Sequence, residues 1–208
     1  MVEKPPRLSM FRSYTPADLL TLGNASCGTL SIFACLSYIA GDRSPQIWAA
    51  FALPVLALVL DVLDGYVARL PTRRQSALGA DLDSLADIVS FGVAPAVLGY
   101  TLGLRGLWDV VLLTYFVCCG ISRLARFNAT SEALTNAATG KVRYFEGTPI
   151  PTSILLVMIM AALFQLGLTG NHFAGGHVNL VSRGFHPFSV LFAVSGSLMI
   201  STIRFPKF

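Results

Sequence analysis

Six long apolar segments dominate this sequence and restrict it to a fold that crosses a membrane. They cover roughly residues 17–40, 47–68, 82–104, 107–126, 150–169 and 186–203. A bilayer core requires about 20 consecutive apolar residues per helix, and only 12% of the residues are charged, about half the share of an ordinary soluble domain. We therefore predict an all-α integral membrane protein with six transmembrane helices, forming a single domain over residues 1–208.

The basic residues are spread unevenly over the connections, which predicts the orientation. With six spans, the side of the termini holds Lys4, Arg7, Arg12, Arg69, Arg73, Arg74, Arg123, Arg126, Lys141, Arg143, Arg204 and Lys207. The opposite side holds Arg43, Arg105 and Arg183. The positive-inside rule then places both termini in the cytoplasm. The net charge of +4 fits this topology and contact with anionic lipids, and nothing indicates nucleic acid as a partner.

The segment before the first span predicts how that span begins. The stretch LSMFRSYTPADLL mixes apolar and basic residues and favours a short helix at the membrane interface. Thr15 and Pro16 are a typical helix start.

The cysteines and histidines show no metal-ligand spacing. We expect Cys27, Cys35, Cys118 and Cys119 to be reduced packing residues within spans. A connection on the non-cytoplasmic side holds His172, His177 and His186, for which we expect no metal role.

Four aspartates stand inside the second and third apolar segments. LDVLDGYVAR places Asp61 and Asp64 on one stripe of a helix, and GADLDSLAD does the same for Asp83 and Asp87. A charge at the bilayer centre costs at least about 3 kcal/mol, so such residues usually have partners and a function. A short loop joins the two helices, so all four carboxylates should meet near the cytoplasmic end. Asp81 is about 200 degrees around the helix from Asp83 and should point away.

The grouping of these carboxylates predicts a divalent metal site. Like charges this close repel, so either cations compensate them or some are protonated. Oxygen ligands without histidine or cysteine suit Mg²⁺ or Mn²⁺, which carboxylates commonly bind together with phosphate groups. Gly65, Ala68 and Gly79 leave room beside the acids for a large polar ligand. The pattern therefore indicates metal-assisted attack on a phosphoryl group.

The same residues carry a family resemblance. Asp61, Asp64, Gly65, Ala68 and Arg69, followed by Gly79, Asp83 and Asp87, match the motif D-x-x-D-G-x-x-A-R and G-x-x-x-D-x-x-x-D. This pattern resembles the CDP-alcohol phosphatidyltransferase family, although the linker after Arg69 is one residue longer than usual. The resemblance implies a six-span transferase that requires Mg²⁺ or Mn²⁺.

Three further stretches are similar to the family members that use L-serine as the acceptor. They are LDSLADIVSFGVAPA, SRLARFN and FEGTPIPTS. This similarity implies that a phosphatidyl group passes from CDP-diacylglycerol to the serine hydroxyl, giving phosphatidylserine and CMP. It also implies a homodimer with the active site facing the cytoplasm, in the endoplasmic reticulum membrane rather than a bacterial inner membrane.

The resemblance also implies residue roles. Asp61, Asp64 and Asp83 become metal ligands, and Asp87 is both a ligand and the general base. CDP-diacylglycerol is expected to contact Asn24, Asp64, Gly65, Ala68, Arg69 and Gly79. For serine we expect Ser90, Arg123 and Arg126, since a guanidinium can bind a carboxylate through two hydrogen bonds.

Other interpretations remain open at this stage. A sibling enzyme that uses inositol or glycerol phosphate would share the aspartates. A cation transporter would also place carboxylates in a membrane, although here they occupy only two adjacent spans. Arg69, Arg123 and Arg126 are alternatively residues that extend to the interface, and Asn24 is alternatively a simple contact between helices.

Overall fold

The structure is a computed structural model that describes residues 15–41, 45–68, 77–136, 144–170, 178–180, 183–201 and 204–206. The first helix, α1, runs over Pro16–Ala40 and begins with a capping box. The Asp18 amide donates to Thr15 Oγ1 at 3.3 Å, and the Thr15 amide donates to Asp18 Oδ2 at 2.6 Å. These two bonds satisfy amides that the helix start leaves free. The predicted start at Thr15 and Pro16 is confirmed, while the proposed interfacial helix lies outside the described residues.

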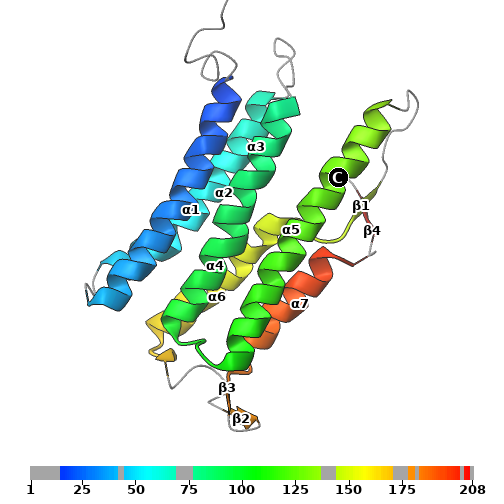
Figure 1. The fold of residues 1–208 in the computed structure, drawn as a ribbon. Coiled ribbons are helices and arrows are strands. Elements are labelled where there is room, and N and C mark those ends of the chain that lie inside the picture. Colours follow the sequence, from blue (N-terminus) through cyan, green and yellow to red (C-terminus); the bar gives the residue numbers. More distant parts are fainter. Residues whose placement is uncertain are drawn as a thin grey trace, which may run out of the picture.

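Four long helical stretches form the main bundle (Figure 1). After α1 come α2 (Gln46–Ala68), then α3 (Ala77–Asp87), the π-helix η2 (Ile88–Val93) and α4 (Ala94–Leu102) in one line, and then α5 (Leu107–Asn136). Among the described residues, four stretches are long and apolar enough to cross a membrane: Pro16–Ala40, Gln46–Val67, Gly79–Leu102 and Leu107–Ala129. Successive stretches run in opposite directions, as in a helical integral membrane protein.

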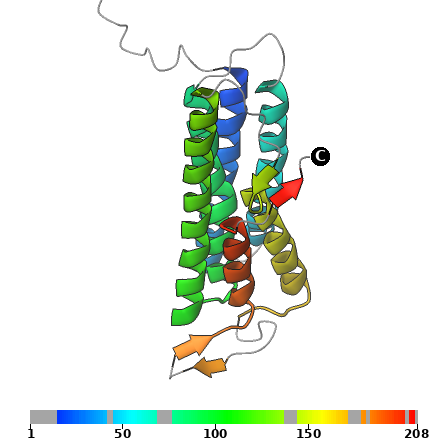
Figure 2. The ribbon, with the colours of Figure 1, turned by 90° about the vertical axis from the view of Figure 1, so that its right-hand side faces the viewer.

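The last two helices are shorter than the sequence predicted. The 3-10 helix η3 (Ile150–Ser153) leads into α6 (Ile154–Gln165), and α7 covers Ser189–Met199. At 1.5 Å per residue α7 is about 16 Å long, against a bilayer core of about 30 Å. Gly167 in the left-handed region follows the end of α6, and a turn from His186 precedes α7. Both helices occupy one half of the bundle's height (Figure 2), and six full spans remain a prediction.

Two short antiparallel ribbons accompany the helices, which a purely α-helical prediction did not include. Strand β1 (Tyr144–Glu146) pairs with β4 (Arg204–Pro206), and β2 (Val178–Leu180) pairs with β3 (Arg183–Phe185). Gly147 follows β1 with φ 76°, and a Cβ there would clash with the main-chain oxygen of Met199. Only glycine therefore allows β1 to join the end of α7 so closely.

The core is formed where α1 packs along α2 and where α5 packs against α7. Phe116 and Phe192 meet edge to face at 5.3 Å between ring centroids. Gly28 on α1 lets Ser90 of η2 approach, because a Cβ at Gly28 would clash with Ser90. Cys27, Cys35 and Cys119 are buried, Cys118 is exposed, and all four are free thiols, as predicted.

Candidate functional site

Three aspartates from two helices meet near one end of the bundle. Asp61 on α2 and Asp83 and Asp87 on α3 each offer a carboxylate oxygen, and these oxygens all lie within 4.8 Å of one another. Asp87 is eight residues into the span that starts at Gly79, or about 12 Å from its end. This is the end of the bundle at which α2 finishes and α3 begins (Figure 1). The structure thus groups three of the four carboxylates that the sequence predicted to meet.

Asp64 belongs to the same region but has its own partner on α1. Its side chain is 6% exposed, and its Oδ2 accepts a 2.7 Å hydrogen bond from Thr21 Oγ1. The Thr21 oxygen also lies 3.1 Å from the main-chain oxygen of Ala17. Because a hydroxyl has one proton, the carboxylate at the shorter distance is the better acceptor. No sequence pattern predicts this contact of Thr21, since a threonine in an apolar helix carries no functional signature.

Asn24 connects α1 to the aspartate cluster and to η2. Its side chain is fully buried, and its Nδ2 donates to Asp87 Oδ1 at 3.2 Å. Its main-chain oxygen accepts a 2.8 Å hydrogen bond from the Ser90 hydroxyl. The Asn24 side chain thus contacts Asp87. The Ser90 hydroxyl is used in a contact between η2 and α1. A π-helical turn, such as η2 here, is a frequent feature of functional sites.

The carboxylate cluster fits a divalent cation. Asp83 Oδ1 is buried and has no hydrogen-bond partner among the described residues. Such an orphaned acceptor calls for an ion, a water or a ligand. The donor set consists of carboxylate oxygens, which suit hard cations such as Mg²⁺ and Mn²⁺. The residues present therefore fit a metal ion of this class.

The basic residues of α5 divide into two environments. Arg123 is partly buried, its Nε has no partner within the described part of the chain, and it interacts electrostatically with Asp87. Arg126 is exposed on the same helix. Of the two predicted serine contacts, Arg123 is the one that the structure associates with the cluster.

The remaining predicted ligand contacts surround the cluster or lie outside the described residues. Gly65 has open space beside it, since a Cβ there would meet nothing within 4 Å. Gly79 is in the first turns of α3 and half-buried. Ala68 ends α2, but its side chain is not described, and Arg69 lies outside the described residues.

Asn128 forms a second contact between α3 and α5. Its Nδ2 donates to Ser84 Oγ at 3.0 Å and lies 3.5 Å from Asp81 Oδ1. Asp81 is exposed and stands outside the three-aspartate group, as its helical position predicted. These hydrogen bonds join α3, which carries Asp83 and Asp87, to α5.

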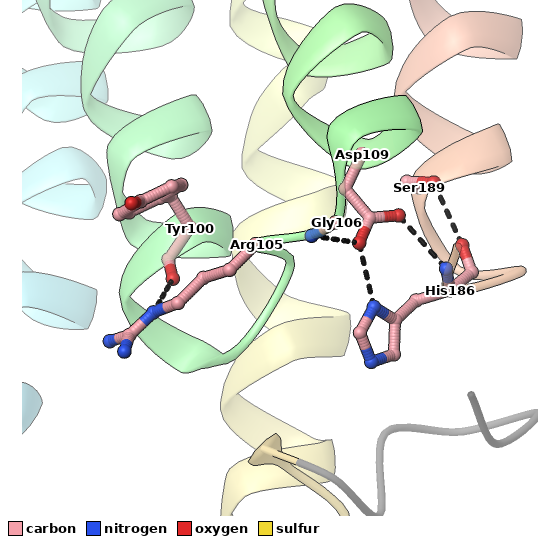
Figure 3. A network of polar contacts seen from close by, with 6 residues as sticks. All are labelled: Tyr100, Arg105, Gly106, Asp109, His186 and Ser189. Carbon is pink, nitrogen blue, oxygen red and sulfur yellow. Dashed lines mark hydrogen bonds and ion pairs between the residues drawn. The ribbon is translucent and has the colours of Figure 1, made fainter. Parts of the chain in front are cut away.

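A buried polar network lies at the opposite end of the bundle (Figure 3). Asp109 near the start of α5 accepts from the Gly106 amide at 2.9 Å and from the His186 amide at 2.9 Å, and it pairs with His186 Nδ1 at 2.6 Å. The two residues are 77 apart in sequence, so no local pattern could reveal the pair. His186 has a structural partner here, while His172 and His177 lie outside the described residues.

These features define a class: a helical membrane protein with a carboxylate cluster suited to a divalent cation near one end of its bundle. The sequence profile of CDP-alcohol phosphatidyltransferases matches residues 14–195. The chain therefore belongs to the CDP-alcohol phosphatidyltransferase family, a family of transferases. The family resemblance carried by the aspartate motif is thus confirmed.

Several curated relatives carry more specific names. A CDP-diacylglycerol–serine O-phosphatidyltransferase of Saccharomyces cerevisiae is 41% identical over 202 residues, covering 96% of this chain and 73% of the yeast protein. An enzyme of the same name from Helicobacter pylori strain J99 is 36% identical over 94% of this chain and 73% of its own length. An archaetidylserine synthase of Methanothermobacter thermautotrophicus is 36% identical over 91% of this chain and 69% of its own. The comparison with solved structures finds no match.

Proposed function

We propose that this chain is a CDP-diacylglycerol–serine O-phosphatidyltransferase, a phosphatidylserine synthase. The observation that carries the proposal is the meeting of Asp61, Asp83 and Asp87 within 4.8 Å in a chain of this family. The relatives named for serine transfer support the choice of acceptor. The reaction joins L-serine and CDP-diacylglycerol to give phosphatidylserine and CMP.

Asp61, Asp64, Asp83 and Asp87 are the proposed metal ligands, with Mg²⁺ or Mn²⁺ as the ion. When bound, such an ion neutralises charge on the phosphate oxygens during phosphoryl transfer. Thr21 orients Asp64 through its 2.7 Å hydrogen bond, and Asn24 orients Asp87 through its 3.2 Å hydrogen bond. The α1 helix therefore fixes two of the four proposed ligands.

Asp87 is the proposed general base. It takes the proton of the serine hydroxyl, whose oxygen attacks the phosphorus that bears diacylglycerol. The bond from that phosphorus to the oxygen shared with CMP breaks, and CMP leaves with the electron pair. Asp87 needs its substrate hydroxyl close by. We assign the serine carboxylate to Arg123, whose buried Nε has no partner among the described residues. Arg126 and Ser90 are assigned supporting roles around the acceptor.

The proposed CDP-diacylglycerol contacts lie on the α1, α2 and α3 side of the cluster. Gly65 leaves open space beside Asp64 for a large group. Ala68, Arg69 and Gly79 are the other proposed contacts, by their positions in the family motif. Asn24 is a further expected contact, and it donates a hydrogen bond to Asp87.

The proposal includes a membrane topology. Residues 1–208 form one domain with six spans, in which the segments around α6 and α7 supply the fifth and sixth. Both termini and the aspartate cluster face the cytoplasm, as the basic residues favour. We further propose a homodimer in the endoplasmic reticulum membrane, surrounded by membrane lipids.

The proposal is tested with purified protein, CDP-diacylglycerol and isotopically labelled L-serine in the presence of Mn²⁺ or Mg²⁺. The expected result is a labelled phospholipid identified as phosphatidylserine by mass spectrometry. Labelled inositol and labelled glycerol 3-phosphate are run in parallel, and a lipid product from one of these alone would favour a sibling enzyme. Cation flux into vesicles without any lipid product would favour the transporter.

A further inference from the structure

One buried oxygen beside Asp87 has no hydrogen-bond partner among the residues that the structure describes. It is Oδ1 of Asn24, whose side chain is 0% exposed. Two other polar groups of Asn24 are used, because Nδ2 donates to Asp87 Oδ1 and the main-chain oxygen accepts from Ser90. Burying an acceptor without a partner is costly, so this oxygen calls for a partner beyond the residues that the structure describes, and a bound ligand can supply one.

The orientation of the Asn24 amide identifies what that partner must offer. The Nδ2 group of Asn24, which carries both donors of the amide, faces Asp87 and donates to its Oδ1 at 3.2 Å. The amide oxygen is thereby turned away from Asp87 and can only accept. The missing partner is therefore a hydrogen-bond donor or a cation.

A second buried group without a partner, on α5, indicates what else the missing ligand must offer. Arg123 on α5 has a buried Nε without a partner in the described part of the chain, and it interacts electrostatically with Asp87. The described residues thus offer an unpaired cationic group on α5, Arg123, and an unpaired acceptor on α1, Asn24 Oδ1, whose amide bonds to Asp87. A small zwitterion with a hydroxyl group matches this set.

We propose that Asn24 Oδ1 accepts a hydrogen bond from the ammonium group of the acceptor amino acid. The inference rests on the proposed function and adds a determinant of acceptor specificity. Serine then contacts three groups of the chain: Asp87 through its hydroxyl, Arg123 through its carboxylate and Asn24 through its ammonium group. Inositol and glycerol phosphate have no ammonium group, so they leave the Asn24 oxygen unpaired and are disfavoured.

The test compares L-serine with 3-hydroxypropionate, which keeps the hydroxyl and the carboxylate and lacks the ammonium group. In the wild-type enzyme, the inhibition constant of 3-hydroxypropionate should be at least about tenfold higher than the KM for serine. In Asn24→Ala, the KM for serine should rise roughly tenfold to a hundredfold, while the inhibition constant of 3-hydroxypropionate should change less than about twofold. A fall in kcat also accompanies this variant, because Asp87 loses its hydrogen bond.

Two rival partners for Asn24 give different results. If the oxygen binds the cytosine amine, Asn24→Ala raises the KM for CDP-diacylglycerol instead, and the proposal is overturned. If it binds the metal, Asn24→Ala lowers the Mn²⁺ affinity, measured by electron paramagnetic resonance, by more than the roughly 10–100-fold expected from the loss of an outer-shell partner of Asp87, and this again overturns the proposal. Thr21→Val is the matched control one turn away on α1, and it should leave the ratio of the serine and 3-hydroxypropionate constants unchanged.

The proposal stays testable even if Asn24→Ala does not fold. Equal binding of serine and 3-hydroxypropionate by the wild-type enzyme would contradict it without any variant. Failure of the proposed function looks different, since it means that serine yields no phosphatidylserine at all.

Discussion

Thr21 and Asp64 lie 2.7 Å apart, oxygen to oxygen, and their hydrogen bond joins α1 to α2 at the level of the aspartate cluster. Thr21 is 4% exposed and Asp64 is 6% exposed, so neither can replace this partner freely with water. A hydrogen bond to a charged group contributes about 1.5–3 kcal/mol. Thr21 is therefore a positioning residue for one of the proposed metal ligands.

Thr21→Val should lower kcat/KM by roughly tenfold, because Asp64 loses its donor and turns from its position. Thr21→Ser keeps the hydroxyl and should restore most of the activity. Thr29 provides the control on the same helix, because it is exposed and its hydroxyl bonds to the main-chain oxygen of Ala25 at 2.9 Å. Equal losses in Thr21→Val and Thr29→Val would refute the positioning role.

Asp83→Asn should remove most of the activity, whereas Asp81→Asn should keep most of it. Asp83 belongs to the three-carboxylate group, while Asp81 is exposed and faces Asn128. The loss for Asp83→Asn should exceed the roughly 10–100-fold loss that follows removal of an outer-shell partner of a metal ligand. Steady-state CMP release measures both variants, and similar losses in both would show that the helical register is wrong.

Divalent metal should stabilise the folded protein as well as activate it. At a Mn²⁺ concentration 100 times the dissociation constant, binding should contribute about 2.7 kcal/mol to the free energy of unfolding. Asp83→Asn should lose this gain yet be no less stable than the wild type without metal, since it removes one of three like charges. Thermal unfolding in detergent, with Mn²⁺ and with EDTA, measures both quantities. An unchanged metal response in Asp83→Asn would exclude Asp83 as a ligand.

Asp109→Asn should destabilise the protein without altering the chemistry of its folded fraction. The Asp109 carboxylate accepts from two amides and pairs with His186, and leaving a buried polar group without its partner costs about 1–3 kcal/mol. Tyr115→Phe is the control between the same helices, because the exposed Tyr115–Ser197 hydrogen bond should contribute little. The unfolding midpoint and the KM for serine are measured together. A raised KM with an unchanged midpoint would contradict a purely structural role.

The aspartate cluster could be predicted from the sequence further than the fold around it. Asp61, Asp83 and Asp87 were identified because carboxylates in apolar helices are rare and their spacing follows the helical period. The contacts of Thr21 and Asn128 were not predicted, because hydroxyl and amide side chains are common in helices. Their role depends on partners that lie on other helices. The Asp109–His186 pair depends on the approach of α5 and α7, which no local pattern encodes.

The last two helices are shorter than their hydropathy predicted, for a physical reason. Apolar character continues over 150–169 and 186–203, but a turn at His186 and the left-handed Gly167 limit α7 and α6. Hydropathy reports where a chain prefers lipid and does not report where its backbone changes direction. The start of α1 was predictable because Thr15, Pro16 and Asp18 form a local capping signal.

The central claim is most directly tested by CMP release from CDP-diacylglycerol by the purified protein. Each acceptor, L-serine, inositol and glycerol 3-phosphate, is supplied separately with Mn²⁺ or Mg²⁺ and then with EDTA. We predict release that requires serine, stops with EDTA and is lost in Asp87→Asn. Release with a different acceptor alone, or release that persists in Asp87→Asn, would contradict the account.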